Sequence, residues 1–147
     1  MRILMVLERD YPPDERVENE INILLHSGYE IVLACTSHLK EISIEKSGNL
    51  TIYRIPMPNW IYKSGAVALL FPFYFNFWKR HLNRVLNETH PDVLHLHDLP
   101  LIKICRELAN EFKIPLVSDY HENRPEIMKM YKHVNIFSME RHQLKGI

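Results

Sequence analysis

Short apolar runs recur along the chain and alternate with stretches in which apolar residues have helical spacing. The runs cover residues 3–7, 29–34, 93–96 and 116–118. A short continuous apolar run is typical of a strand that is buried on both faces of a sheet. Because strands and helices alternate, the sequence predicts an α/β fold with a mostly parallel central sheet and helices on both faces.

Local signals indicate where the helices and turns lie. Asp14 is placed to cap a helix, and Gly28 suits the left-handed residue that closes it. Between them the apolar residues recur at helical spacing: Val17, Ile21, Leu24 and Leu25. Residues 99–112 repeat this pattern, and a further helical stretch begins at Pro125. Residues 42–56 alternate around a Ser-Gly-Asn sequence, which predicts a strand or a hairpin.

Size and composition limit the classes of function. The 147 residues are enough for one domain, and the 18 basic residues balance the 18 acidic ones. Because the formal net charge is zero, no general field attracts nucleic acid. Cys35 and Cys105 lie in apolar surroundings and do not make a disulfide framework, which predicts a reducing cytoplasm. The first ten residues hold too few apolar positions for a signal-peptide core.

Polar side chains follow three of the predicted strands. In open parallel sheets, ligands bind outside the carboxyl ends of the strands. The first strand is usually central in such a sheet, so we expect these polar groups to share one crevice. They are Glu8, Arg9, Asp10, His97, Asp98, Asp119, His121 and Glu122.

Several titratable residues near the strand ends also have a structural explanation. Asp98 precedes a Leu-Pro pair and is placed to cap a helix, and Asp119 can satisfy backbone donors in a turn. His95 is predicted to be a hydrogen-bonded histidine of the core. His121 and Glu122 have no comparable explanation, and we expect the imidazole of His121 to face a ligand.

Three motifs, in order, carry a resemblance to a known family. Asp-x-Arg-Val-x-x-Glu opens the first helix at 14–20, His-x-His-Asp occupies 95–98, and Asp-x-His-Glu occupies 119–122. With these motifs the chain resembles the amino-terminal domain of family 4 retaining glycosyltransferases, which have two Rossmann-like domains in the GT-B fold. The resemblance covers nearly the whole chain. It implies that residues 1–147 form a single Rossmann-like domain, a three-layer α/β sandwich.

The resemblance also implies roles for individual residues. His121 would be the catalytic residue, a loop histidine that approaches the transferred sugar and the acceptor hydroxyl. Asp98, Asp119 and Glu122 would bind substrate, with Asp98 and Glu122 shaping the acceptor side of the cleft. Arg16 would face a phosphate or an anionic acceptor at the amino end of its helix. No metal and no cofactor is expected, because the nucleotide-sugar donor is itself a substrate.

The substrates and the setting follow from the same resemblance. It implies transfer with retention from a nucleotide-sugar donor to a saccharide or lipid-linked acceptor, in polysaccharide or glycolipid biosynthesis. The expected location is the cytoplasm, at the inner face of the membrane. In the family, a carboxyl-terminal domain binds most of the nucleotide-sugar. We therefore expect these 147 residues to be a fragment that folds but is inactive on its own.

The segment 60–81 allows more than one interpretation. Residues 66–78 are almost wholly apolar and rich in aromatic side chains, and Lys79-Arg80-His81 follows them, a combination that suits a lipid headgroup region. The stretch is too short to span a bilayer, and Pro72 interrupts it. The alternative is a helix packed on the sheet. Exposed aromatic side chains here would also favour self-association.

Two other classes of function stay open. A metal-dependent hydrolase would use His95, His97, Asp98, His121 and Glu122, since a His-x-His pair at a strand end places two imidazoles on one side of a metal. A non-catalytic Rossmann-like module would use the same edge to bind a small anion or a partner chain.

Overall fold

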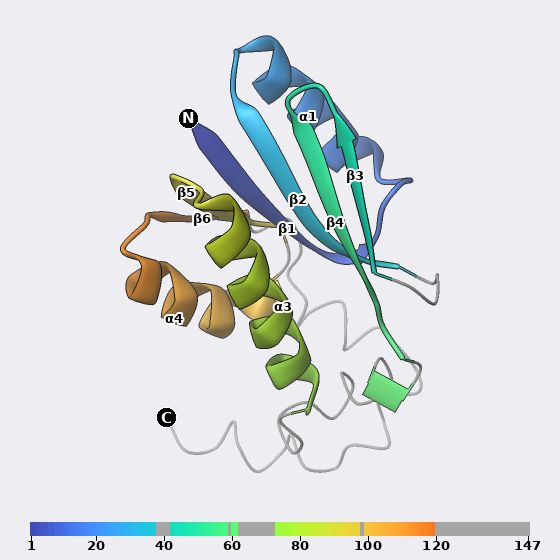
Figure 1. Cartoon of the computed structure of the whole chain (residues 1–147), viewed down its shortest axis with the longest axis vertical. Helices are drawn as coiled ribbons and strands as arrows, with labels where there is room; N and C mark the ends of the chain where they lie inside the picture. The colour runs from blue at the N-terminus through green and yellow to red at the C-terminus, as the bar shows by residue number, and fades with distance from the viewer. Residues whose placement is uncertain (38–41, 59, 62–72, 98, 120–147) are drawn as a thin grey trace, which may run out of the picture.

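The computed structural model describes residues 1–37, 42–58, 60–61, 73–97 and 99–119. Within them one sheet has the strand order β3-β4-β2-β1-β5-β6 (Figure 1). The strands are β1 (Arg2–Asp10), β2 (Glu30–Ser37), β3 (Ser43–Ser47), β4 (Leu50–Pro56), β5 (Val93–Leu96) and β6 (Leu116–Ser118). Every neighbouring pair is parallel except β3 and β4. The prediction of a mostly parallel sheet with an interior first strand is confirmed.

Alternate residues of β1 point into two separate cores. Residues 3, 5 and 7 pack with α1 (Glu15–His26) on one face of the sheet. Residues 4 and 6 pack with α3 (Phe73–Thr89) and α4 (Ile102–Phe112) on the other face, where these two helices lie side by side (Figure 1). Because both faces of β1 are covered, every residue of its apolar run is buried. The predicted three-layer arrangement is confirmed.

Helix α1 begins and ends where the sequence predicts. The Val17 N–H donates to Oδ1 of Asp14 at 3.2 Å, which satisfies one of the donors left free at a helix start. At the other end Gly28 has φ +83, and the Tyr29 N–H donates back to the Leu24 carbonyl at 3.1 Å. A left-handed residue in that position closes the helix and turns the chain into β2.

The shorter elements also follow local patterns. β3 and β4 form the antiparallel hairpin, and Gly48 takes the left-handed conformation in its turn, with φ +56. β5 and β6 have the predicted bounds. The helical stretch 99–112 divides into the 3₁₀ turn η2 (Leu99–Leu101) and α4. The helix expected after Pro125 lies outside the described residues.

The described end of the aromatic segment, residues 73–81, is helical and packs on the sheet, as the second interpretation of residues 60–81 predicts. α3 continues to Thr89, beyond the end of that segment, and its buried side chains recur at helical spacing: Tyr74, Trp78, His81, Leu82, Val85, Leu86 and Thr89. Trp60 and Phe73 remain exposed, in edge-to-face contact with ring centroids 6.2 Å apart. Residues 62–72 lie outside the described part. Among the described residues no helix is long and apolar enough to cross a membrane.

Both cysteines are free and buried, as predicted. Cys35 lies in β2, and Cys105 lies in α4 on the opposite side of the sheet. Burial raises the pKa of each thiol to about 12, so neither is a thiolate at neutral pH. They are packing residues of the two cores.

Candidate functional site

The carboxyl ends of β1, β5 and β6 lie together, as the sheet topology requires. The His97 N–H donates to the Val6 carbonyl at 3.1 Å, and the Asp119 N–H donates to the Leu96 carbonyl at 2.9 Å. Asp119 therefore leaves the sheet directly beside the end of β5. The polar residues that follow these strands start from one edge of the sheet.

Two of the predicted site residues lie in the described part of the chain. Asp119 follows β6, and Arg16 is in the first turn of α1 with its Nε 3.9 Å from Oδ1 of Asp14. The Arg16 side chain keeps 35% of its surface exposed, so its guanidinium remains within reach of solvent. Asp98, His121 and Glu122 lie outside the described residues.

The polar residues of the first strand are arranged differently from the prediction. Glu8, Arg9 and Asp10 belong to β1 instead of following it, and the register with β2 shifts between Val6 and Asp10. The Tyr74 hydroxyl donates to Glu8, and the Thr36 hydroxyl donates to Oδ1 of Asp10 at 3.0 Å. These carboxylates therefore tie β1 to α3 and β2.

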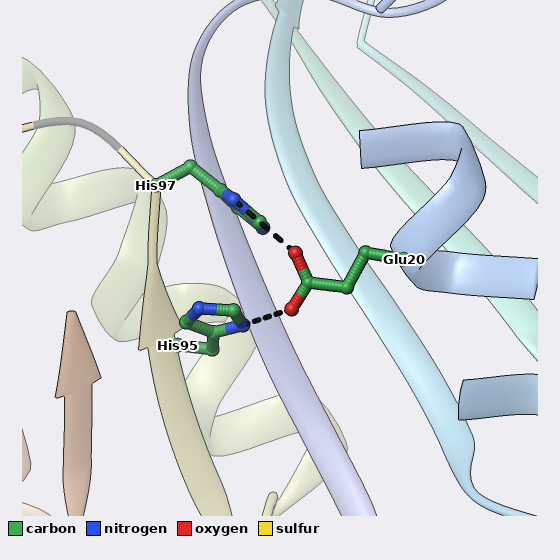
Figure 2. A group of neighbouring side chains, drawn as sticks. All are labelled: Glu20, His95 and His97. Atoms are coloured by element: carbon green, nitrogen blue, oxygen red, sulfur yellow. Dashed lines mark ion pairs between the residues drawn. The ribbon is translucent and has the colours of Figure 1, made fainter. Parts of the chain in front are cut away.

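A histidine of β5 and a second one just after it meet a carboxylate of α1 (Figure 2). His95 lies in β5 and His97 follows its last residue, two positions on, so their side chains point to the same face, where α1 carries Glu20. Nδ1 of His95 is 3.1 Å from Oε1 of Glu20, and Nδ1 of His97 is 3.8 Å from Oε2. The two rings are tilted by 43°, with centroids 4.5 Å apart. Figure 2 shows the carboxylate pointing toward both rings.

Both histidines are buried beneath α1. His95 is buried against a polar partner, as the core interpretation predicts. His97 was expected at the open edge, but its side chain has no exposed surface. The reason is the pleat of β5, which directs residue 97 to the same covered face as residue 95. His97 is therefore not an open rim residue.

The pKa of His97 is lowered to about 4: burial is the largest cause, the neighbouring His95 and Arg16 contribute to the lowering, and Asp14 opposes it. The imidazole of His97 is therefore neutral at neutral pH. The charges of Asp14 and Arg16 act on the His97 imidazole, so both residues lie near it. The first-helix motif and the His-x-His motif, which are far apart in sequence, thus lie close together in the fold.

Glu20 is the residue of this cluster to which the sequence analysis assigned no role. It ends the first-helix motif, and it lies three residues after Val17 and one before Ile21, both of which are buried. A carboxylate within the inward stripe of an amphipathic helix is unusual, because burying a charge without a partner is costly. The position of Glu20 among the buried residues of this helix was the sequence signal that could have identified it.

The cluster offers the ligands of a metal site. Glu20, His95 and His97 each provide one ligand atom, and these atoms all lie within 4.8 Å of one another. The hydrolase hypothesis combined the same two histidines with Asp98, His121 and Glu122, which are outside the described residues. Within the described part, the carboxylate that joins the histidines is Glu20.

No protein-family model and no curated protein matches the chain. Solved structures do match it. Trehalose-6-phosphate synthase from E. coli, bound with UDP-2-fluoro glucose, superposes with a TM-score of 0.62 and 15% identity, over 92% of this chain and 37% of that one. Sucrose-phosphate synthase from Thermosynechococcus elongatus superposes with a TM-score of 0.69 and 10% identity, over 98% of this chain and 39% of that one.

A third match is the UDP-forming α,α-trehalose-phosphate synthase from Burkholderia vietnamiensis, with a TM-score of 0.59, 16% identity, and 80% of this chain covered against 32% of that one. The chain thus spans less than two fifths of the length of each of these three structures. These neighbours are glycosyltransferases of the GT-B fold. Their likeness shows that this chain has the Rossmann-like α/β fold that they contain.

Proposed function

We propose that the chain is the amino-terminal, acceptor-side domain of a retaining glycosyltransferase of the GT-B type, related to family 4. The parent enzyme would transfer a sugar from a nucleotide-sugar donor to a saccharide or lipid-linked acceptor, in polysaccharide or glycolipid biosynthesis at the cytoplasmic face of the membrane. The main support is the match over 92% of the chain to a synthase structure that holds UDP-2-fluoro glucose. A further matching structure is that of a trehalose-6-phosphate synthase studied for enzymatic glycosyltransfer with retention.

The edge formed by β1, β5 and β6 supports the placement of the site. Transfer with retention is thought to proceed on one face of the sugar, with the leaving diphosphate helping to deprotonate the acceptor. The protein would mainly position the reactants and stabilise developing charge. In this proposal His121 approaches the reacting sugar, and Asp98, Asp119 and Glu122 bind the acceptor.

Arg16 would contribute positive charge to the same edge. It lies in the first turn of α1, where free N–H groups and the helix dipole favour an anion. The partial exposure of its side chain is compatible with this role. No metal takes part in the proposed transfer step.

Peripheral membrane contact through residues 60–81 belongs to the same proposal. Of the described aromatic residues in that segment, Trp78 is buried in the core, so it cannot insert into lipid. Trp60 and Phe73 are exposed and in contact with each other, which supports a small apolar anchor at that end of α3. In self-association, the exposed Trp60 and Phe73 side chains would instead contact a second copy of the chain.

The test is reconstitution of transfer. On its own the chain should not transfer sugar, whereas fusion to the nucleotide-binding domain of a family 4 enzyme should restore transfer from a radiolabelled nucleotide-sugar. His121→Ala in the fusion should then lower the rate by about 100-fold or more, as for the loss of one group that stabilises transition-state charge.

His26→Ala is the matched control, because His26 is exposed on α1 and its ring nitrogen Nδ1 is hydrogen-bonded to the Asn22 carbonyl of the same helix. Its rate should equal that of the unchanged fusion. Full activity of the His121 variant would remove the site assignment. Absence of transfer with any nucleotide-sugar, in a fusion that folds and binds nucleotide, would count against the function itself.

A further inference from the structure

The cluster of Glu20, His95 and His97 is built from two rigid elements that the fold already holds together. His95 lies in β5, which is paired on both sides within the sheet, and His97 is the next residue after the strand, where its N–H donates to the Val6 carbonyl at 3.1 Å. Glu20 is in the second turn of α1, whose first turn is fixed by the Asp14 cap. Sites on strands and helices hold their geometry better than sites on loops.

The three side chains match a known donor set. Two histidines and a glutamate, with a fourth position left for water, are a common set for Zn²⁺. Zinc bonds of about 2.0–2.2 Å in a tetrahedron require neighbouring ligand atoms to lie about 3.3 Å apart. Nδ1 of His95 and Oε1 of Glu20 are 3.1 Å apart, close to that value. Nδ1 of His97 is 3.8 Å from the other carboxylate oxygen, Oε2, and one ligand atom of each of the three residues lies within 4.8 Å of the others, so the side chains would have to close around the ion.

The environment of His97 provides an independent observation. Its side chain is completely buried, and within the described part of the chain neither of its ring nitrogens has a hydrogen-bond partner. A buried polar side chain is normally satisfied, so this one requires an explanation. A hydrogen bond between His95 and Glu20 accounts for two members of the cluster and leaves His97 unexplained. A cation between the three groups gives Nδ1 of His97 a partner.

We propose that Glu20, His95 and His97 bind a divalent transition metal of the Zn²⁺ class, which joins α1 to β5 beneath the carboxyl edge of the sheet. The positive charge of the Arg16 guanidinium disfavours a metal ion nearby, and the negative charge of the Asp14 carboxylate beside it offsets that effect. The metal would have a structural role, because it would link α1 to the sheet and both histidine ligands are buried beneath α1, whereas the Glu20 side chain keeps 31% of its surface exposed. The site does not depend on the proposed transfer activity.

The test is a titration of the full 147-residue chain, freed of metal with a chelator, with ZnCl₂ in a calorimeter. One ion per chain should bind. Glu20→Gln keeps the size of the side chain and its ability to accept a hydrogen bond, but replaces the carboxylate ligand. It should weaken binding by at least about tenfold, since even loss of an outer partner of a metal site costs about 10–100-fold. His26→Ala, on the same helix but exposed, should bind as the unchanged chain does.

Co²⁺ provides a second readout that needs no variant. Bound by two histidines and a carboxylate, it should give the strong visible absorption of low-coordinate Co²⁺, and added Zn²⁺ should abolish it. No heat with Zn²⁺ and an unchanged Co²⁺ spectrum in the unmodified chain would overturn the proposal. Equal Zn²⁺ affinity in a folded Glu20→Gln variant, verified by circular dichroism, would also overturn it, because exposed histidines would then be the ligands.

Discussion

The two faces of the sheet bury histidine in different surroundings. On the α3 face, His81 lies beside Trp78 with ring centroids 6.0 Å apart, and its Nε2 has no hydrogen-bond partner among the described residues. On the α1 face, His95 and His97 lie against the carboxylate of Glu20. Burial lowers the pKa of both His81 and His97 to about 4.

The comparison shows that a lowered pKa does not by itself identify a site. Removal from water is the main cause for both histidines. What separates them is the set of neighbours: an aromatic ring and the Tyr53 backbone on the α3 face, and a carboxylate with a second imidazole on the α1 face. We infer that the α3 face mainly supplies packing energy and that the α1 face carries the chemistry.

The largest test of this division is removal of Trp78, which is fully buried in the core of the α3 face. Trp78→Ala should lower the free energy of unfolding by about 3–5 kcal/mol, because the change removes a large apolar side chain and leaves a cavity. Urea denaturation would measure it. Phe73→Ala is the control on the same helix: its side chain is exposed, so the loss should be about 0.5 kcal/mol. Similar losses for the two variants would contradict the assigned packing of α3.

How much of the molecule could be predicted from sequence depends on whether the signal is local. The bounds of β5 and β6, the Asp14 cap and the Gly28 terminus follow from short patterns, and all are confirmed. The free, buried state of both cysteines also followed from their apolar surroundings.

The length of α3 and the partner of His95 depend on contacts between residues far apart in the sequence. The aromatic segment was bounded at the basic residues 79–81, whereas α3 continues because Leu82, Val85 and Leu86 keep its inner face apolar. The partner of His95 is on a helix far earlier in the chain, so no local pattern could pair it with Glu20. The roles of Asp98, His121 and Glu122 stay predictions.

A pH titration tests the α3 face when the unchanged chain is compared with a His81 variant, because His97 contributes to both. Folded His81 has its pKa lowered to about 4 from an ordinary value of 6.5, so between these values the unfolded chain binds more protons. The stability from this residue is therefore fully present above pH 6.5 and is lost as pH falls toward 4.

His81→Phe should remove this component. The slope of unfolding free energy against pH in that window should fall by at most about 1.4 kcal/mol per pH unit, the value for one proton. Urea denaturation at several pH values between 4 and 7 would measure the slope. A variant whose slope equals that of the unchanged chain, with only a constant offset, would show that His81 is not held neutral by the core.

The smallest test concerns how α1 is positioned. Asp14 caps α1 through its side chain, whereas Leu101, at the start of α4, makes no side-chain cap. Asp14→Ala should cost about 1 kcal/mol of unfolding free energy, because the Val17 N–H loses its acceptor. Asp14→Asn keeps an acceptor oxygen and removes only the charge that faces Arg9 and Arg16, so its cost should be a few tenths of a kcal/mol. If both variants lose the same stability in urea denaturation, the ion pairs and not the cap hold the start of α1. The helix that carries Glu20 would then be fixed to the sheet by charge, and its position would change with salt concentration.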